Sequence, residues 1–208
     1  YDIFRPDVEA ALARATEQRA EVGSMRVEMF PRPVLVLGDV HLGSDGPELR
    51  LDQIRMEPVL GSLLQSRKVF REVSVKGGIF EAPQVAGVAA ILGALAGPAS
   101  GMAVEKLTFE DTELSFAGLG VSGMEGEARL SADGTLESLA MNSRDGSLRV
   151  AMTPSAGKLE VGVEGVGWRP SEESPYRFDS LTVSGSIADG ALTVTCLDLR
   201  LLDGKVQG

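Results

Sequence analysis

The sequence predicts a mainly β protein with a few helices, an α+β fold built around a long twisted antiparallel sheet. Apolar and polar residues alternate with a period of two in residues 148–153, 159–164 and 181–184, which places every second side chain on one face of a sheet. Asp-Gly, a dipeptide typical of tight turns, occurs five times in the chain. Because little helix is predicted in the C-terminal half, what covers the apolar face of this sheet becomes the functional question.

The N-terminal region is predicted to open with a helix over residues 7–20, which Asp7 caps and in which apolar residues recur at helical spacing. Strands separated by turns containing Pro or Gly follow, at 24–30, 34–42, 48–56 and 69–80. A short helix at Pro58–Gln65 carries an apolar stripe for packing on the sheet. Gly77-Gly78 permits a kink or a bulge in the last of these strands.

Residues 83–98 form a predicted helix that is apolar nearly all round and is too short to cross a bilayer. A helix buried against the sheet is the favoured interpretation, and an interfacial or lipid-contacting helix is the alternative. From Met102 onward, short strands and turns alternate regularly, which indicates antiparallel meanders. We therefore divide the chain into a helix/β region at 1–82, an Ala/Gly-rich helix at 83–100 and a β-groove region at 101–208, which together form one continuous unit.

Charge excludes one class of partner. The net charge is −10, and residues 81–208 carry 9 basic and 18 acidic side chains, whereas residues 1–80 carry 11 and 12. An acidic surface repels phosphate backbones, so we expect no binding to nucleic acid. The nearly balanced N-terminal part is better suited to a membrane surface.

The single cysteine, Cys196, lies at an apolar position of a predicted strand, and we interpret it as a small buried hydrophobic residue. One cysteine allows no intramolecular disulfide, which is compatible with a reducing compartment and also with the periplasm. The chain starts at Tyr1 rather than Met and stops within a strand pattern, so we expect that an N-terminal anchor has been removed.

No catalytic or metal-binding constellation is predicted, and no cofactor is expected. The only histidine, His41, would have to serve any Ser-His-Asp or Cys-His arrangement, but no nucleophile motif accompanies it. Glu110, Asp111 and Glu113 form a small acidic group that a solvated turn explains better than a calcium site.

Three further features are better explained by structure than by catalysis or ligand binding. Glu125 and Glu127 share one strand face, which fits the wet face of a sheet better than a glycosidase pair. The glycines of 118–126 lack the strand–loop–helix context of a phosphate-binding loop. Trp168 is interpreted as a turn aromatic packed on the sheet edge, with a ligand platform as the alternative.

Two stretches resemble the AsmA family of bacterial envelope proteins. The first runs from Arg26 to Ile79 and has these landmarks: Met29-Phe30-Pro31-Arg32-Pro33, Leu37-Gly38-Asp39-Val40-His41-Leu42, Leu51–Met56, Val59–Leu64 and Phe70–Gly78. The second runs from Phe178 to Gly185 and on through Gly190-Ala191-Leu192 to Asp203–Gly208, and is similar to a recurring unit of the family. The helix at 83–98 departs from the family pattern.

The resemblance implies a protein held in the inner membrane by one N-terminal helix, with the rest in the periplasm. It implies a sheet curled into a groove with an apolar interior, and a role in phospholipid movement and outer-membrane homeostasis. The larger members of the family are described as bridges that pass phospholipid between membranes.

An open aliphatic face is chemically suited to acyl chains, because each methylene taken out of water contributes about 0.8 kcal/mol. We therefore predict a non-enzymatic periplasmic lipid-binding groove with phospholipid acyl chains as its ligand. The predicted lining is Leu148, Val150, Met152, Leu159, Val161, Val163, Leu181, Val183, Leu192 and Val194. The alternative is that these side chains form the dry core of a β-sandwich or closed barrel.

A second function is also open. In a structural or assembly module of an envelope or secretion machine, the sheet edge at Asp203–Gly208 would pair with a strand of a partner protein. A hydrolase that uses His41 is a distant third.

Overall fold

The computed structural model describes residues 9–10, 13, 19–43, 49–62, 64–65, 68–81, 102–116, 119–131, 135–170, 174, 176–188, 191–201 and 204–207. Thirteen strands account for most of these residues, and η2 (Leu60–Ser62) is a single turn of 3-10 helix. The strands are β1 (Ala20–Glu28), β2 (Val34–Leu42), β3 (Leu49–Pro58), β4 (Lys68–Lys76), β5 (Ile79–Glu81), β6 (Met102–Phe116), β7 (Leu119–Leu130), β8 (Leu136–Ser143), β9 (Leu148–Ser155), β10 (Lys158–Trp168), β11 (Phe178–Ala188), β12 (Ala191–Leu201) and β13 (Gly204–Gln207).

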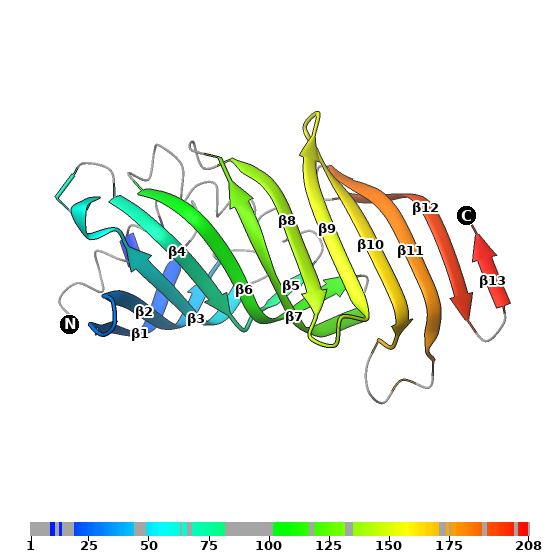
Figure 1. Ribbon diagram of the computed structural model, residues 1–208, viewed down its shortest axis with the longest axis horizontal. Coiled ribbons are helices and arrows are strands. Elements are labelled where there is room, and N and C mark those ends of the chain that lie inside the picture. The colour runs from blue at the N-terminus through cyan, green and yellow to red at the C-terminus, as the bar shows by residue number, and fades with distance from the viewer. Residues whose placement is uncertain are drawn as a thin grey trace.

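All the strands belong to one long twisted sheet (Figure 1). Its order follows the sequence from β1 to β13, with β5 beside β6 and off the main path. Neighbours are antiparallel except that β4 and β5 both run parallel to β6. The sheet is therefore continuous between the two halves of the chain, because residues 68–76 pair directly with residues 102–110.

The prediction of an α+β fold with covering helices is wrong. Among the described residues no helix reaches seven residues, and sheet dominates throughout. Residues 9, 10 and 13 of the predicted helix at 7–20 are helical, but β1 already begins at Ala20. The predicted helix at 83–98 lies outside the described residues.

The predicted helix at Pro58–Gln65 is also wrong, since only the three residues of η2 are helical there. The hydroxyl of Ser62 donates to the carbonyl of Val59 at 2.7 Å and accepts from the backbone N–H of Val69 at 2.8 Å. A serine side chain that bonds nearby backbone groups offers the chain an alternative to helix. The segment consequently forms a tight connection between β3 and β4, in which Leu60 and Leu64 are exposed rather than packed on the sheet.

A line of irregular residues crosses the sheet and bends it. Asp39 on β2, Gly77 after β4, Asp111 on β6 and Gly123 on β7 all have φ between 52° and 69°. The strand registers place these four residues at corresponding heights along their strands, because Gly38 faces Gln53, Gln53 faces Lys76, Lys76 faces Glu110, and Thr112 faces Met124. Irregular residues of this kind bend a strand and increase its local twist, so we call the four residues the bend line.

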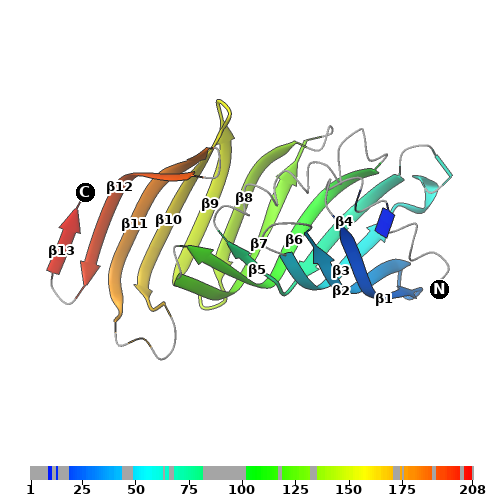
Figure 2. The ribbon, with the colours of Figure 1, turned by 180° about the vertical axis from the view of Figure 1, so that it is seen from behind.

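Two contacts stabilise the bend between β6 and β7. The hydroxyl of Thr112, which is completely buried, donates to the carbonyl of Met124 at 3.1 Å. On the solvent side, Arg144 in the β8–β9 turn donates to Asp111 at 3.0 Å and to Glu125 at 3.4 Å. Beyond the bend, the ends of β6 and β7 turn away from the rest of their strands, with β5 alongside (Figure 2).

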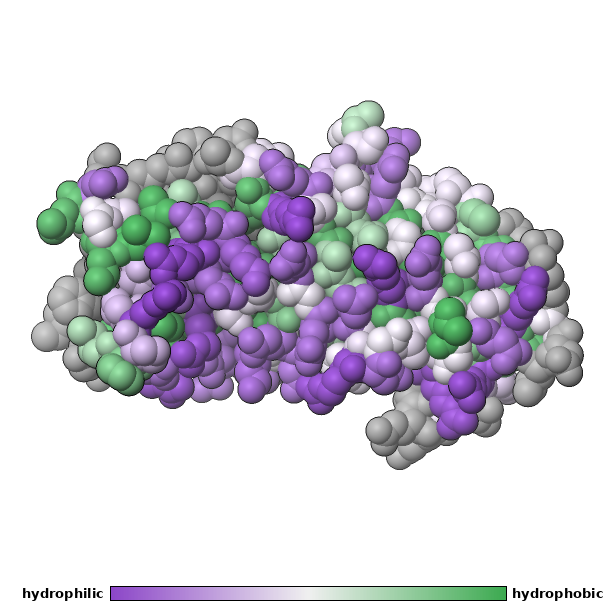
Figure 3. Space-filling model, in the orientation of Figure 1, coloured by the Kyte–Doolittle hydropathy of each residue, from purple (hydrophilic) through white to green (hydrophobic). Residues whose placement is uncertain are grey.

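The core lies on the concave face of the sheet. Buried apolar side chains from β1 to β11 form one cluster, including Leu37 on β2, Leu107 on β6 and Met152 on β9 at no more than 1% exposure. Along β9 every second residue from Leu148 to Met152 is buried, and on β8 Leu139 and Met141 follow the same alternation, as expected for a sheet with one wet face. The opposite, convex face is mostly hydrophilic (Figure 3).

Burial decreases toward the C-terminal end of the sheet. In β12 the first six residues are all exposed, whereas β9 buries Leu148, Val150 and Met152. The apolar face is thus closely packed at β9, whereas the first half of β12 leaves it open.

Candidate functional site

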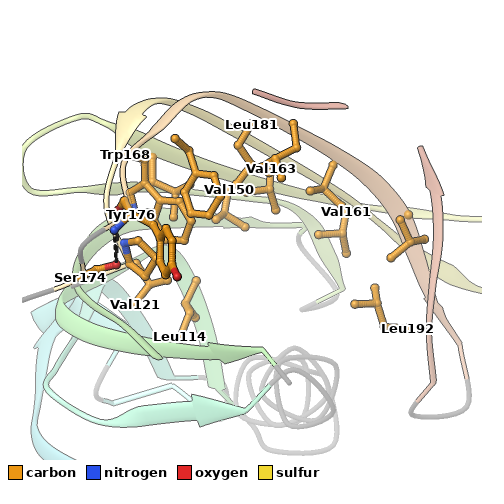
Figure 4. A pocket seen from close by; sticks show the side chains of 17 residues that line it. Leu114, Val121, Val150, Val161, Val163, Trp168, Ser174, Tyr176, Leu181 and Leu192 are labelled. Atoms are coloured by element: carbon orange, nitrogen blue, oxygen red, sulfur yellow. Dashed lines mark hydrogen bonds between the residues drawn. The ribbon is translucent and has the colours of Figure 1, made fainter. Parts of the chain in front are cut away.

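A cavity of about 710 Å³ lies between the concave face of β9–β12 and the bent ends of β6 and β7. This volume is in the range of protein pockets that bind small molecules. Figure 4 shows Leu114 and Val121 on one wall, facing Val150, Val161 and Val163 on the other. The described lining residues are Leu114, Val121, Leu148, Val150, Val161, Val163, Trp168, Pro170, Ser174, Tyr176, Phe178, Leu181, Val183, Gly185, Leu192, Val194 and Leu199.

Eight of the ten lining residues predicted from the sequence contribute to this cavity. The strand registers bring them together, since Val163 on β10 lies between Val150 on β9 and Val183 on β11. The eight are Leu148, Val150, Val161, Val163, Leu181, Val183, Leu192 and Val194.

The other two predicted residues, Met152 and Leu159, are not in the described lining. They are part of the core cluster, at 0% and 8% exposure. At the other extreme, Leu192 is 44% and Val194 is 51% exposed. The predicted lining therefore contains two kinds of residue: core side chains on β9 and β10, and open side chains on β12.

The second wall was not predicted from the sequence. Leu114 follows Asp111 on β6 and Val121 precedes Gly123 on β7, so both belong to the segments beyond the bend line. The only sequence signal was the acidic group at 110–113, which we interpreted as a turn. That group instead includes the bulge at which β6 changes direction, where its register with β7 shifts between Phe109 and Leu114.

Aromatic side chains form one end of the cavity. The rings of Trp168 on β10 and Phe178 on β11 are stacked, with centroids 5.4 Å apart and an interplanar angle of 19°. Trp168 is 8% exposed and lines the cavity, so it is part of the site rather than only an edge residue. Next to it, Arg177 donates to the carbonyl of Gly167 at 3.2 Å and closes the base of the loop that joins the two strands.

The cavity offers almost no polar contact. Within the described lining no side chain is charged, and the hydroxyl-bearing residues are Ser174 and Tyr176. The hydroxyl of Ser174 bonds the backbone N–H and carbonyl of Tyr176 at 3.3 Å each, so it is already engaged within the loop. A pocket with so few oriented polar groups cannot position a polar substrate, but it can exclude water from a hydrocarbon.

The polar residues singled out in the sequence lie elsewhere. His41 on β2 pairs in register with Glu21 and Arg50, on the opposite face from the buried Val40 and Leu42. It is not among the described residues that line the cavity.

Glu125 and Glu127 form surface ion pairs on the wet face of β7. The carboxylate of Glu125 accepts from Arg144, and that of Glu127 lies 3.8 Å from Lys106 and 3.7 Å from Arg129. Within the described part of the chain, no three His, Cys, Asp or Glu side chains are grouped as metal ligands would be.

The burial predicted for Cys196 is wrong, because its side chain is exposed. The register between β11 and β12 shifts at Thr195: Ser184 pairs with Cys196, whereas the next residue, Gly185, pairs with Val194. The hydroxyl of Thr195 donates to the carbonyl of Ser184 at 3.0 Å in this bulge. One extra residue reverses the alternation, so Leu192, Val194 and Leu199 line the cavity while Cys196 faces solvent.

Helical segments in the described part of the chain fall short of the length and hydropathy that crossing a bilayer requires. No protein-family model and no curated protein matches this sequence.

Proposed function

We propose that this chain is a non-enzymatic lipid-binding protein whose cavity shields phospholipid acyl chains from water. The observation that carries the proposal is the cavity of about 710 Å³, whose described lining is aliphatic and aromatic and carries no charge. Each acyl methylene buried there would contribute about 0.8 kcal/mol. A lining without oriented polar groups binds hydrocarbon without selecting a headgroup, and lets a chain slide.

The unequal burial of the lining supports the same proposal. Val150, at 1% exposure, is a closely packed part of the cavity wall, whereas Leu192 and Val194 leave apolar surface open at β12. Monomeric proteins rarely leave such surface without a partner for it. With the resemblance to the AsmA family, we propose a place in the bacterial envelope, on the periplasmic side of the inner membrane, and a role in phospholipid movement.

The experiment uses a photo-crosslinkable fatty acid and mass spectrometry of a lipid extract of the purified chain. The test variant is Val194→Lys, because Val194 is half exposed and a lysine there does not disrupt the core. The matched control is Thr193→Lys, on the same strand, also exposed and on the opposite face. Lysine at the buried Val150 would unfold the protein whatever the cavity binds, so it cannot serve as the test.

We expect the wild type and Thr193→Lys to be labelled equally and to release phospholipid on extraction. Val194→Lys should keep its unfolding midpoint and lose most of the labelling, because hydrocarbon bound at β12 would remove water from the ammonium beside it. Absence of lipid from the extract together with absence of labelling would exclude the proposal, as would equal labelling of the two variants.

A second candidate function rests on the C-terminal edge of the sheet. In the described structure β13 pairs with β12 on one side, and residues 204–207 end the strand order. An unpaired strand edge is a template for a strand from another chain. A backbone-pairing partner captured through this edge, with an empty cavity, would favour the assembly-module function over lipid binding.

A further inference from the structure

Large apolar side chains project into solvent at one end of the sheet, far along the strand order from the cavity. Met29 and Phe30, in the β1–β2 connection, are 72% and 91% exposed, and Leu60 and Leu64, in the β3–β4 connection, are 60% and 98% exposed. We call these four residues the apolar tip. Hydrophobic atoms gather at the left end of Figure 3, where Figure 1 shows these two connections.

The two connections form one surface because the strands bring them together. β1 ends and β2 begins next to the end of β3, since Glu28 pairs with Val34 and Leu35 pairs with Met56. Glu57 of β3 links the β1–β2 connection to β4. Its carboxylate accepts hydrogen bonds from Arg32 of that connection at 2.9 Å and from Arg71 of β4 at 2.8 Å.

The outward direction of the leucines is fixed by the local structure. Ser62, between Leu60 and Leu64, is 4% exposed, and its hydroxyl bonds the backbone of Val59 and Val69. The connection thus buries Ser62 and exposes Leu60 and Leu64, which reverses the usual distribution of residues. A backbone held in this way presents these two leucines to solvent.

The charges around the apolar tip differ from those of the rest of the chain. In residues 26–34, 55–60 and 68–72, the basic side chains are Arg26, Arg32, Arg55, Lys68 and Arg71, and the acidic ones are Glu28, Glu57 and Glu72. This end is therefore net positive in a chain whose net charge is −10. Arg26 and Arg32 remain more than 60% exposed although each pairs with a glutamate.

We propose that the apolar tip docks the protein on a bilayer that contains anionic phospholipid. Exposed aromatic and aliphatic side chains enter the boundary between headgroups and acyl chains, and the surrounding arginines contact lipid phosphates. The acidic C-terminal part would then be held away from the membrane surface by charge repulsion. This inference does not depend on the cavity, which lies between the bent ends of β6 and β7 and the strands β9–β12.

The test is flotation of the purified chain with vesicles of phosphatidylcholine alone and of phosphatidylcholine mixed with phosphatidylglycerol. The variant is Phe30→Ser/Leu64→Ser, which alters two side chains more than 90% exposed and so preserves the fold. The matched control is Val166→Ser, which alters an apolar residue of β10 that is 75% exposed and lies outside the apolar tip.

We expect the wild type and Val166→Ser to bind the anionic vesicles, weakly at high salt, and the double variant to bind about tenfold less. The cavity variant Val194→Lys should bind the vesicles as the wild type does. The experiment can therefore contradict membrane docking without contradicting lipid binding in the cavity, and the reverse. Equal binding of wild type and double variant would overturn the proposal. The wild type could instead bind neither kind of vesicle and form a dimer that the double variant does not form. That result would overturn membrane docking and assign the apolar tip to contact between copies of this chain.

Discussion

The carboxylate of Asp52 on β3 occupies the space into which a side chain on Gly77 would extend. A Cβ built on Gly77 would overlap the carboxylate of Asp52, and the φ of Gly77 is +69°, in the region that favours glycine. The same crowding recurs nearer the N-terminus, where a Cβ on Gly23 would lie 2.7 Å from the Cβ of Asp39. At Asp39 and at Gly77, the bend line therefore has a glycine and an aspartate side by side on neighbouring strands.

Replacing Gly77 by alanine should lower the free energy of unfolding by about 2–3 kcal/mol, because the change adds both a steric overlap and a strained φ. Urea unfolding followed by circular dichroism measures this change. Gly123→Ala has the same strain, with φ +66°, but meets no atom within 4 Å, so it should cost about 1–2 kcal/mol.

Gly162→Ala on β10 is the control, since it meets no atom within 4 Å and does not have a positive φ. It should leave stability unchanged or raise it by up to about 1 kcal/mol. If all three alanine variants unfold at the same urea concentration, the bend does not depend on these glycines.

The contribution of Glu57 to stability should depend on pH. The hydrogen bond from Arg32, supported by Arg71, lowers the pKa of Glu57 below its usual value of 4.5. A carboxyl group whose pKa is lower in the folded state stabilises that state above the unfolded pKa, and this contribution is lost as pH falls through the folded pKa. Acidification below about pH 4.5 should therefore reduce the urea midpoint.

Glu57→Gln should reduce the midpoint at neutral pH and make its fall on acidification shallower, because glutamine does not titrate. Part of the slope should remain, since hydrogen bonds from Arg55 and from Ser143 lower the pKa of Glu28 and of Asp145 as well. A variant with the same acid slope as the wild type would show that the Arg32–Glu57–Arg71 contact does not form.

Cys196 should react with a thiol reagent in the native protein about as fast as in the unfolded chain, because the bulge at Thr195 turns it to solvent. Cys196→Ser should change the free energy of unfolding by no more than about 0.5 kcal/mol, as for other surface substitutions. Slow labelling that becomes fast only in urea would instead place the thiol in the core and contradict the bulge.

Strand alternation placed eight of the ten predicted residues on the face that lines the cavity, because a period of two assigns faces correctly as long as the register is regular. The same rule failed at Cys196, where a single bulge reverses the parity, and no residue type at Thr195 announces it. It also missed Leu114 and Val121, because they reach the cavity through a bend made by Asp111 and Gly123. The kink permitted at Gly77-Gly78 is confirmed by φ values of 69° and 104°.

More helix was predicted from the sequence than the described residues contain, for a related physical reason. Apolar runs such as Val59–Leu64 fit a helix stripe, but periodicity alone does not distinguish a stripe that packs from one that projects into solvent. In this connection Ser62 takes the buried position and Leu60 and Leu64 are exposed. In the described part of the chain, the bent ends of β6 and β7 enclose part of the concave face, so the sheet itself supplies cover that was expected from helices.

Trp168, the only tryptophan in the chain, should report directly on the occupancy of the cavity. Its indole lines the cavity against Phe178, so a hydrocarbon chain bound there lies next to the fluorophore. A fatty acid brominated along its chain should quench the emission in a saturable manner, and the unbrominated fatty acid should compete. Val194→Lys should weaken this quenching about tenfold or more, because a lysine near the hydrocarbon opposes its burial, whereas Thr193→Lys should leave it unchanged. Quenching that rises linearly without saturation, or equally in both variants, would mean that the chain contacts the brominated lipid without binding it in the cavity.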